Sequence, residues 1–159
     1  MLRCLELVDE YSDQLARRRN IIIGVVQLTL AATGFFDRAT LNLKGGAGAV
    51  LYIGSEQYFL IWLGYGLSTH TRDKLLSLWS LLFVARETCL PELLVYGDSK
   101  TIIDWVNNMV VLEVLTLDHW CVWIKELFLG FNAFFCQHTY REHNLLADRL
   151  SKEALDIFA

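Results

Sequence analysis

The sequence predicts one α/β domain whose core is a five-stranded mixed sheet flanked by helices. Three strand-like segments follow one another in the first part of this domain with no helix between them, which is typical of antiparallel strands. Helical and strand-like segments then alternate, which is typical of strands joined through helices. Of the 159 residues, 54% are hydrophobic and 20% are charged, so the chain can bury the core of a single domain.

A helix and a strand are predicted in the first part of the chain. Apolar residues recur at helical spacing over residues 2–18. Three arginines at 17–19 lie at the end of this helix, where cations complement the helix dipole. Contact with nucleic acid and a targeting signal are the alternative interpretations. The run Ile21–Phe36 is largely apolar, and we expect its second half to form a strand that leads to Asp37.

The next segment is rich in glycine. Residues 44–48 lack the Gly-Lys-Ser/Thr ending of a phosphate-binding loop, so we interpret this segment as a hairpin connection. Two strands are predicted after it, over residues 49–53 and 57–65, with a turn at 54–56 between them.

The rest of the chain alternates between helical and strand patterns. We expect helices over residues 69–86, 99–108, 118–129 and 144–157, and strands over residues 92–96 and 133–140. Ser99 and Asn144 are the residue types that cap the amino ends of helices, and each stands at such a position.

Composition and charge exclude several classes of protein. The formal net charge of −4 argues against a strongly basic nucleic-acid-binding protein, although a local basic face is compatible with it. The four cysteines form no CxxC pair, which favours reduced, buried thiols over disulfides or zinc. The uncharged run at 20–36 is shorter than the ~20 residues that a membrane helix needs, and no secretory signal is visible. We therefore expect an intracellular protein, nuclear or cytoplasmic, that is neither secreted nor bound to a membrane.

Three aspartates stand at the ends of predicted elements. Asp98 follows the strand-like run Leu93–Tyr96, and the carboxyl ends of strands are where ligands tend to bind in α/β sheets. Asp37 ends the first predicted strand, and Asp148 lies in the last predicted helix. Such an acid is by itself more often a loop or cap residue than a catalyst, but three at matching places indicate a shared site.

Four segments, in order, resemble the motifs of the ribonuclease H (type 1) superfamily. They are Phe36–Thr40, similar to Phe-Asp-Gly-Ala-Ser; Thr69–Leu75, similar to Thr-Asn-x-Arg-x-Glu-Leu; Tyr96–Ser99, which matches the third motif; and His138–Asp148, similar to His-x-x-Arg-Glu-x-Asn-x-x-Ala-Asp. The last segment is especially similar to plant retroelement-type, reverse-transcriptase-associated domains. The resemblance implies a ribonuclease H-like fold over residues 29–159, with residues 1–28 as an N-terminal helical extension that has no recognised counterpart.

The resemblance also implies a function. The family activity is metal-dependent endonucleolytic hydrolysis of the RNA strand of an RNA–DNA hybrid, with two Mg²⁺ or Mn²⁺ ions held by carboxylates. Asp37 would bridge the two ions, Asp98 would hold the ion on the nucleophile side, and Asp148 the ion on the leaving-group side. His138 matches the family's proton-transfer histidine; a polar residue at a strand end is the alternative interpretation. We expect a monomer whose partner is a nucleic acid.

Lys74 departs from the family pattern, because it stands where the family has its fourth metal-binding acid, a glutamate. An ammonium at that place would compete with a metal ion, so we expect weakened hydrolysis. The alternative is a catalytically inactive module of the same fold, a retroelement-derived domain that binds nucleic acid or a protein. Asp73 is adjacent, but one helical residue is a rotation of about 100°, so it could replace the glutamate only in a distorted turn.

Arg38 is the second departure, because the family has a glycine after its first acid. Its side chain would crowd the metal site, contact a phosphate through its planar guanidinium, or face solvent. The expected substrate-binding residues are Arg38, Arg72, Lys100 and Asn144.

Overall fold

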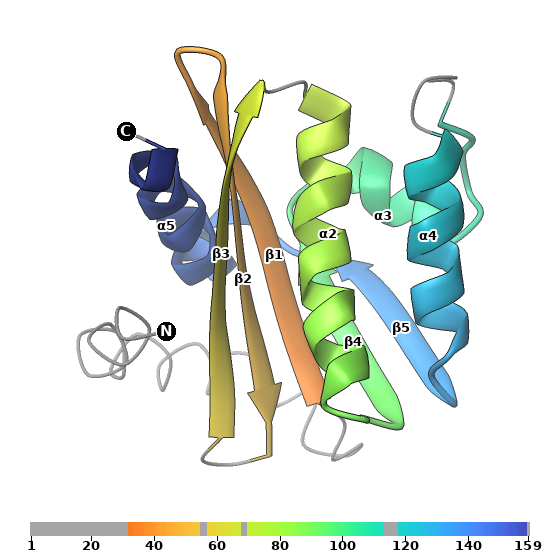
Figure 1. Ribbon diagram of the computed structural model, residues 1–159. Helices are drawn as coiled ribbons and strands as arrows, with labels where there is room; N and C mark the ends of the chain where they lie inside the picture. Colours follow the sequence, from red (N-terminus) through yellow and green to blue (C-terminus); the bar gives the residue numbers. More distant parts are fainter. Residues whose placement is uncertain (1–31, 55–56, 68–69, 113–117, 159) are drawn as a thin grey trace.

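The computed structural model describes residues 32–54, 57–67, 70–112 and 118–158. They form an α/β domain in which helices cover a mixed sheet (Figure 1). In chain order the elements are β1 (Ala32–Leu41), β2 (Lys44–Ile53), β3 (Gln57–Leu67), α2 (His70–Glu87), β4 (Glu92–Gly97), α3 (Lys100–Val106), α4 (Asp118–Leu129), β5 (Ala133–His138), the 3₁₀ helix η2 (Arg141–His143), α5 (Leu145–Ala154) and the 3₁₀ helix η3 (Leu155–Phe158). The helix predicted over residues 2–18 and the extension 1–28 lie outside the described residues.

The sheet has the order β3-β2-β1-β4-β5. β1, β2 and β3 pair antiparallel, whereas β4 runs parallel to β1 and β5 runs parallel to β4. The predicted five-stranded mixed sheet, with its first three strands antiparallel, is therefore confirmed. Phe36 pairs with Gly97 at the end of the β1–β4 ladder, so the next residues, Asp37 and Asp98, emerge side by side.

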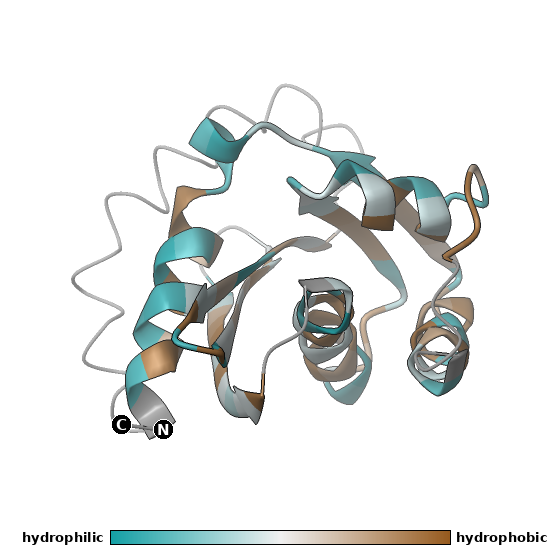
Figure 2. Ribbon diagram, turned by 90° about the horizontal axis from the view of Figure 1, so that it is seen from above, coloured by the Kyte–Doolittle hydropathy of each residue, from teal (hydrophilic) through white to brown (hydrophobic). Residues whose placement is uncertain are grey.

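Each face of the sheet carries its own apolar core. α2, α3 and α4 enclose the larger core, which includes fully buried leucines of α2 and Ile124 of α4. α5 packs on the opposite face of the sheet (Figure 2). Its residues Leu146 and Leu150 belong to the smaller core on that face. No helix in the described part of the chain is long and apolar enough to cross a membrane.

The prediction of a glycine-rich turn at residues 44–48 is wrong, because this segment lies inside β2. The turn between β1 and β2 is formed by Asn42 and Leu43, whose φ angles are 50° and 63°. Two consecutive positive φ angles are typical of the type I′ turn that matches the twist of a tight hairpin. The glycines of residues 44–48 therefore do not form the turn between β1 and β2.

The glycines of β2 allow α5 to approach the sheet closely. A Cβ atom on Gly48 would meet the backbone of Ala147 and Ser151, and one on Gly46 would meet the carbonyl oxygen of Ser151. Strand glycines often mark places where another backbone comes close. Because Gly48 pairs with Asp37 across the β1–β2 ladder, this packing brings α5 next to that aspartate.

The remaining predicted elements are present with shifted ends. β5 ends at His138, two residues before the predicted end, and the last helix changes to 3₁₀ geometry after Ala154. Ser99 and Asn144 occupy the predicted N-cap positions, but neither side chain makes a capping hydrogen bond. The predicted cap positions are thus correct, but the predicted side-chain hydrogen bonds are not formed.

The close packing of α5 on β2 predicts a large effect of one added methyl group. Gly48→Ala should lower the free energy of unfolding by about 1–3 kcal/mol, because the Cβ would overlap backbone atoms that cannot rotate away. Gly66→Ala is the matched control: nothing lies within 4 Å of its added Cβ, so its effect should stay within about 0.5 kcal/mol. Urea unfolding followed by circular dichroism measures both, and equal midpoints for the two variants would contradict this packing.

Candidate active site

The three predicted aspartates line one cleft. Asp37 comes from β1, Asp98 directly follows β4, and Asp148 lies in the first turn of α5. The cleft has a volume of about 830 Å³, and all three carboxylates contribute to its lining. The parallel β1–β4 register and the glycine contact with α5 therefore bring together acids that are far apart in the sequence.

Asp37 is the most buried of the three acids, with 9% of its surface exposed. The backbone N–H of Arg38 donates a hydrogen bond of 2.7 Å to its Oδ1 atom. Burial, followed by the negative charges of Asp98 and Asp148, raises the pKa of Asp37 to about 7, while this N–H and Arg141 act in the opposite direction. Ionising Asp37 is therefore costly near neutral pH.

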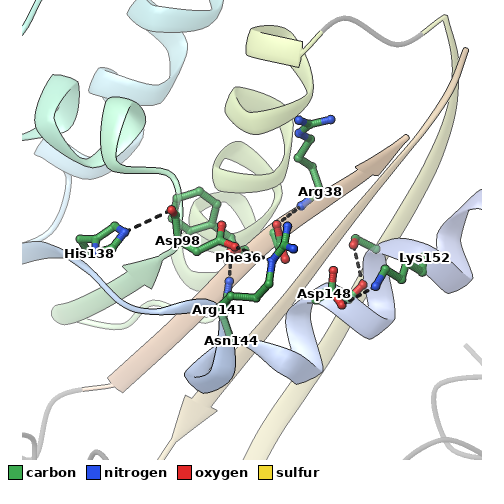
Figure 3. Close-up of polar contacts among 10 residues, drawn as sticks. Phe36, Arg38, Asp98, His138, Arg141, Asn144, Asp148 and Lys152 are labelled. Carbon is green, nitrogen blue, oxygen red and sulfur yellow. Dashed lines mark hydrogen bonds and ion pairs between the residues drawn. The ribbon is translucent and has the colours of Figure 1, made fainter. Parts of the chain in front are cut away.

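Cationic side chains pair with the other two acids (Figure 3). The Nε atom of Arg141 lies 3.9 Å from Oδ2 of Asp98, and the Nζ atom of Lys152 lies 2.7 Å from Oδ2 of Asp148. Both cations line the cleft, and sequence analysis missed both as site residues. The signals were present, since Arg141 lies within the last motif and Lys152 follows Asp148 by four residues, the spacing of neighbours on a helix face.

Lys74 lines the same cleft from α2, together with Ser77 one turn later. Asp73 is fully buried, does not line the cleft, and accepts a hydrogen bond of 3.4 Å from the Thr40 hydroxyl. The expected rotation of one helical residue thus separates the two side chains, and Asp73 does not reach the cleft that Lys74 lines.

The donor set does not fit the two-ion site that the resemblance implies. Carboxylate oxygens suit Mg²⁺, but Asp148 is paired with Lys152, and the ammonium of Lys74 lines the same cleft. Among the described residues, no three histidine, cysteine, aspartate or glutamate side chains lie close enough together to hold a metal ion. The predicted roles of Asp37, Asp98 and Asp148 as metal ligands therefore stay predictions.

His138 ends β5 beside the site. Its Nε2 atom lies 3.2 Å from the backbone carbonyl oxygen of Asp98, and its ring meets Tyr140 edge to face. The residue is exposed, so its imidazole is accessible from the rim, although it does not line the cleft itself.

The four predicted substrate-binding residues lie in different places. Arg38 lines the cleft, and its Nη1 donates to the Thr40 hydroxyl at 2.9 Å. Lys100 pairs with Asp104 at 3.0 Å, and neither it nor Arg72 lines the cleft.

Asn144 requires a correction, because it is fully buried and has no surface to offer to a nucleic acid. Its Nδ2 donates a hydrogen bond of 3.0 Å to the carbonyl oxygen of Phe36, the residue before Asp37. Its backbone carbonyl accepts from the N–H of Asp148 at 3.1 Å. Asn144 thus connects the strand and the helix that carry two of the acids, a role that its place in the sequence does not reveal.

Solved structures with a similar fold include ribonucleases H. RNase H1 from the halophilic archaeon Halobacterium salinarum shares 23% identity, with a TM-score of 0.71 over 80% of this chain and 98% of that one. The N-terminal RNase H domain of rv2228c from Mycobacterium tuberculosis, solved as a fusion with maltose-binding protein, shares 20%, with a TM-score of 0.73 over 80% and 94%. LC11-RNase H1, solved in complex with an RNA/DNA hybrid, shares 19%, with a TM-score of 0.72 over 80% and 98%.

These identities establish the fold and leave the chemistry open. A search of curated proteins found no match. The model of a family described as reverse transcriptase-like matches residues 40–154, most of the domain, beginning three residues after Asp37. Plant origin, which the last motif suggested, is not tested by these matches. The chain therefore has a ribonuclease H-like fold and belongs to the reverse transcriptase-like family.

Proposed function

We propose that this domain binds RNA–DNA hybrids at the cleft of Asp37, Asp98 and Asp148, and that Lys74 weakens hydrolysis of the RNA strand. The observation that carries the proposal is the presence of Lys74 in one cleft with these acids, on an RNase H fold. The structural relative that holds an RNA/DNA hybrid supports the choice of ligand, since its fold matches with a TM-score of 0.72.

The charge of the cleft supports weak catalysis. Four basic and four acidic residues line it, so the charges cancel when all are ionised: Arg38, Lys74, Arg141 and Lys152 against Asp37, Asp98, Asp148 and Asp156. Hydrolysis of a phosphodiester at neutral pH requires cations beside both the attacking and the leaving oxygen. A cleft without net negative charge attracts divalent cations poorly, because the electrostatic attraction of a cation scales with the net negative charge of the residues around it.

His138 is the proposed proton-transfer residue. A histidine imidazole can both accept and donate a proton. Its exposure and its position next to the Asp98 carbonyl allow it to reach a substrate at the rim of the cleft.

A catalytically inactive module that binds nucleic acid or a protein is the second candidate function. Lys74 favours it as well, because an ammonium at the place of a ligand is consistent with lost as well as weakened hydrolysis. The two candidates differ only in whether the unmodified chain cleaves a hybrid.

Cleavage of a labelled RNA–DNA hybrid in Mg²⁺ or Mn²⁺ tests the role of Lys74. Lys74→Glu should cleave at least about tenfold faster than the unmodified chain, because it changes the cleft by two charges and adds a carboxylate ligand. Lys125→Glu makes the same charge change on α4, outside the cleft, and should leave the rate unchanged. Asp98→Asn is the blank.

Equal cleavage rates for Lys74→Glu and Lys125→Glu would contradict the proposal that Lys74 weakens hydrolysis. Cleavage by Lys74→Glu alone would favour the inactive module, whereas cleavage by the unmodified chain that Asp98→Asn abolishes would establish an enzyme.

The raised pKa of Asp37 predicts how stability depends on pH. Asp37 takes up its proton near pH 7 in the folded chain and near 3.8 in the unfolded chain, so the folded state binds more protons between these values. The free energy of unfolding should therefore fall as the pH rises through this window, by at most about 4 kcal/mol. Asp37→Asn still accepts the hydrogen bond from Arg38 but cannot ionise, so it should lose this decline.

Urea unfolding at several pH values between 4 and 8 measures the effect. Asp104→Asn, on α3 outside the cleft, is the matched control and should keep the decline. An unchanged pH profile in Asp37→Asn would show that Asp37 ionises freely in the folded chain.

A further inference from the structure

We propose that Arg38 and Lys74 form an anion subsite in the cleft, which holds a backbone phosphate of a bound nucleic acid without a divalent cation. The inference rests on the proposed function and specifies how the same cleft takes its ligand. Both residues line the cleft, and both carry a positive charge.

Arg38 is held in place by neighbours on β1 and α2. Its Nη1 donates to the Thr40 hydroxyl at 2.9 Å, and this hydroxyl donates to Oδ2 of Asp73 at 3.4 Å. Asp73 is fully buried, so the end of this chain of hydrogen bonds is fixed inside the domain. The bond to Thr40 uses one of the five N–H donors of the guanidinium, which leaves others to bind a ligand.

Lys74 is brought to the same cleft by α2, and it lines the cleft together with Arg38 and Thr40 of β1. Figure 3 shows the Arg38 side chain extending toward α2 and away from Asp148 and Lys152. Two neighbouring elements, β1 and α2, therefore each contribute one cation to the cleft.

The four cations of the cleft differ in whether they form ion pairs. Arg141 and Lys152 form ion pairs with Asp98 and Asp148. In the described part of the chain, neither Arg38 nor Lys74 has a carboxylate oxygen within the 4.0 Å of an ion pair. The hydrogen bond between Arg38 and Asp37 comes from the backbone N–H of Arg38 and does not use its guanidinium. The positive charges of Arg38 and Lys74 are thus available to a ligand.

A phosphodiester is the anion that this pair fits within the proposed function. The planar guanidinium can donate two parallel hydrogen bonds to two phosphate oxygens, and an ammonium adds a point charge from another direction. Because Thr40 and Asp73 already orient Arg38, binding orders little additional chain. Cations that belong to the protein need no metal ion to neutralise the phosphate.

Fluorescence anisotropy with a labelled RNA–DNA hybrid in EDTA tests the subsite. The unmodified chain should bind within about twofold of its affinity in Mg²⁺, with the RNA strand checked for cleavage on a gel. Arg38→Gln and Lys74→Gln should each weaken binding about tenfold and reduce the slope of log K against log salt by about 1. Lys125→Gln, on α4 outside the cleft, is the matched control and should bind as the unmodified chain does.

Arg38→Lys provides a second test, because it keeps the charge and loses the planar fork. It should retain the salt slope and lose part of the affinity, and circular dichroism should show that each variant is folded. Loss of binding in EDTA, or Arg38→Gln and Lys74→Gln binding like Lys125→Gln, would overturn the subsite while the hybrid-binding function stands. No binding of the hybrid by the unmodified chain in either buffer would overturn the proposed function itself.

Discussion

The close approach of α5 to β2 is the contact on which the cleft depends. Gly48 pairs with Asp37 on one side and leaves room for the backbone of α5 on the other, so the helix that carries Asp148 lies within reach of Asp37. The parallel ladder between β1 and β4 places Asp98 at the same point independently. Both constraints are backbone packing, which does not require that the acids hold a metal ion. The fold can therefore persist when the chemistry of the cleft changes.

Clustered carboxylates impose a second constraint, because their mutual repulsion must be offset. The pKa of Asp37 is raised mainly by burial and then by its acidic neighbours, which shows that their repulsion is only partly relieved. Arg141 and Lys152 relieve it at Asp98 and Asp148 through ion pairs that are partly exposed, and such pairs contribute little individually. Lys74 adds a cation that is part of the protein and cannot dissociate. In such a cleft, less of the repulsion between carboxylates is left for a metal ion to offset than in a cleft lined by four acids.

Features that depend on neighbouring residues in the sequence could be predicted, whereas features that depend on contacts between distant segments could not. The strand and helix patterns and the order of the acids are local, and they predicted the sheet and the cleft. The glycines of β2 were misinterpreted because a turn and a close helix contact require the same absence of a side chain, and only the position of α5 distinguishes them. Asn144 was misassigned for a related reason, since its partner, Phe36, is 108 residues away in the sequence.

The two departures from the family pattern are better explained together than separately. Lys74 alone would remove a ligand and leave an ammonium facing the cleft, and Arg38 alone would add bulk beside a metal ion. Because β1 and α2 bring them to one cleft, and because neither has an ion-pair partner among the described residues, they add positive charge that is available to a ligand there. Positive charge attracts a phosphate directly and repels the divalent ions that hydrolysis requires. Weaker catalysis and metal-independent binding would then be two consequences of the same two cations.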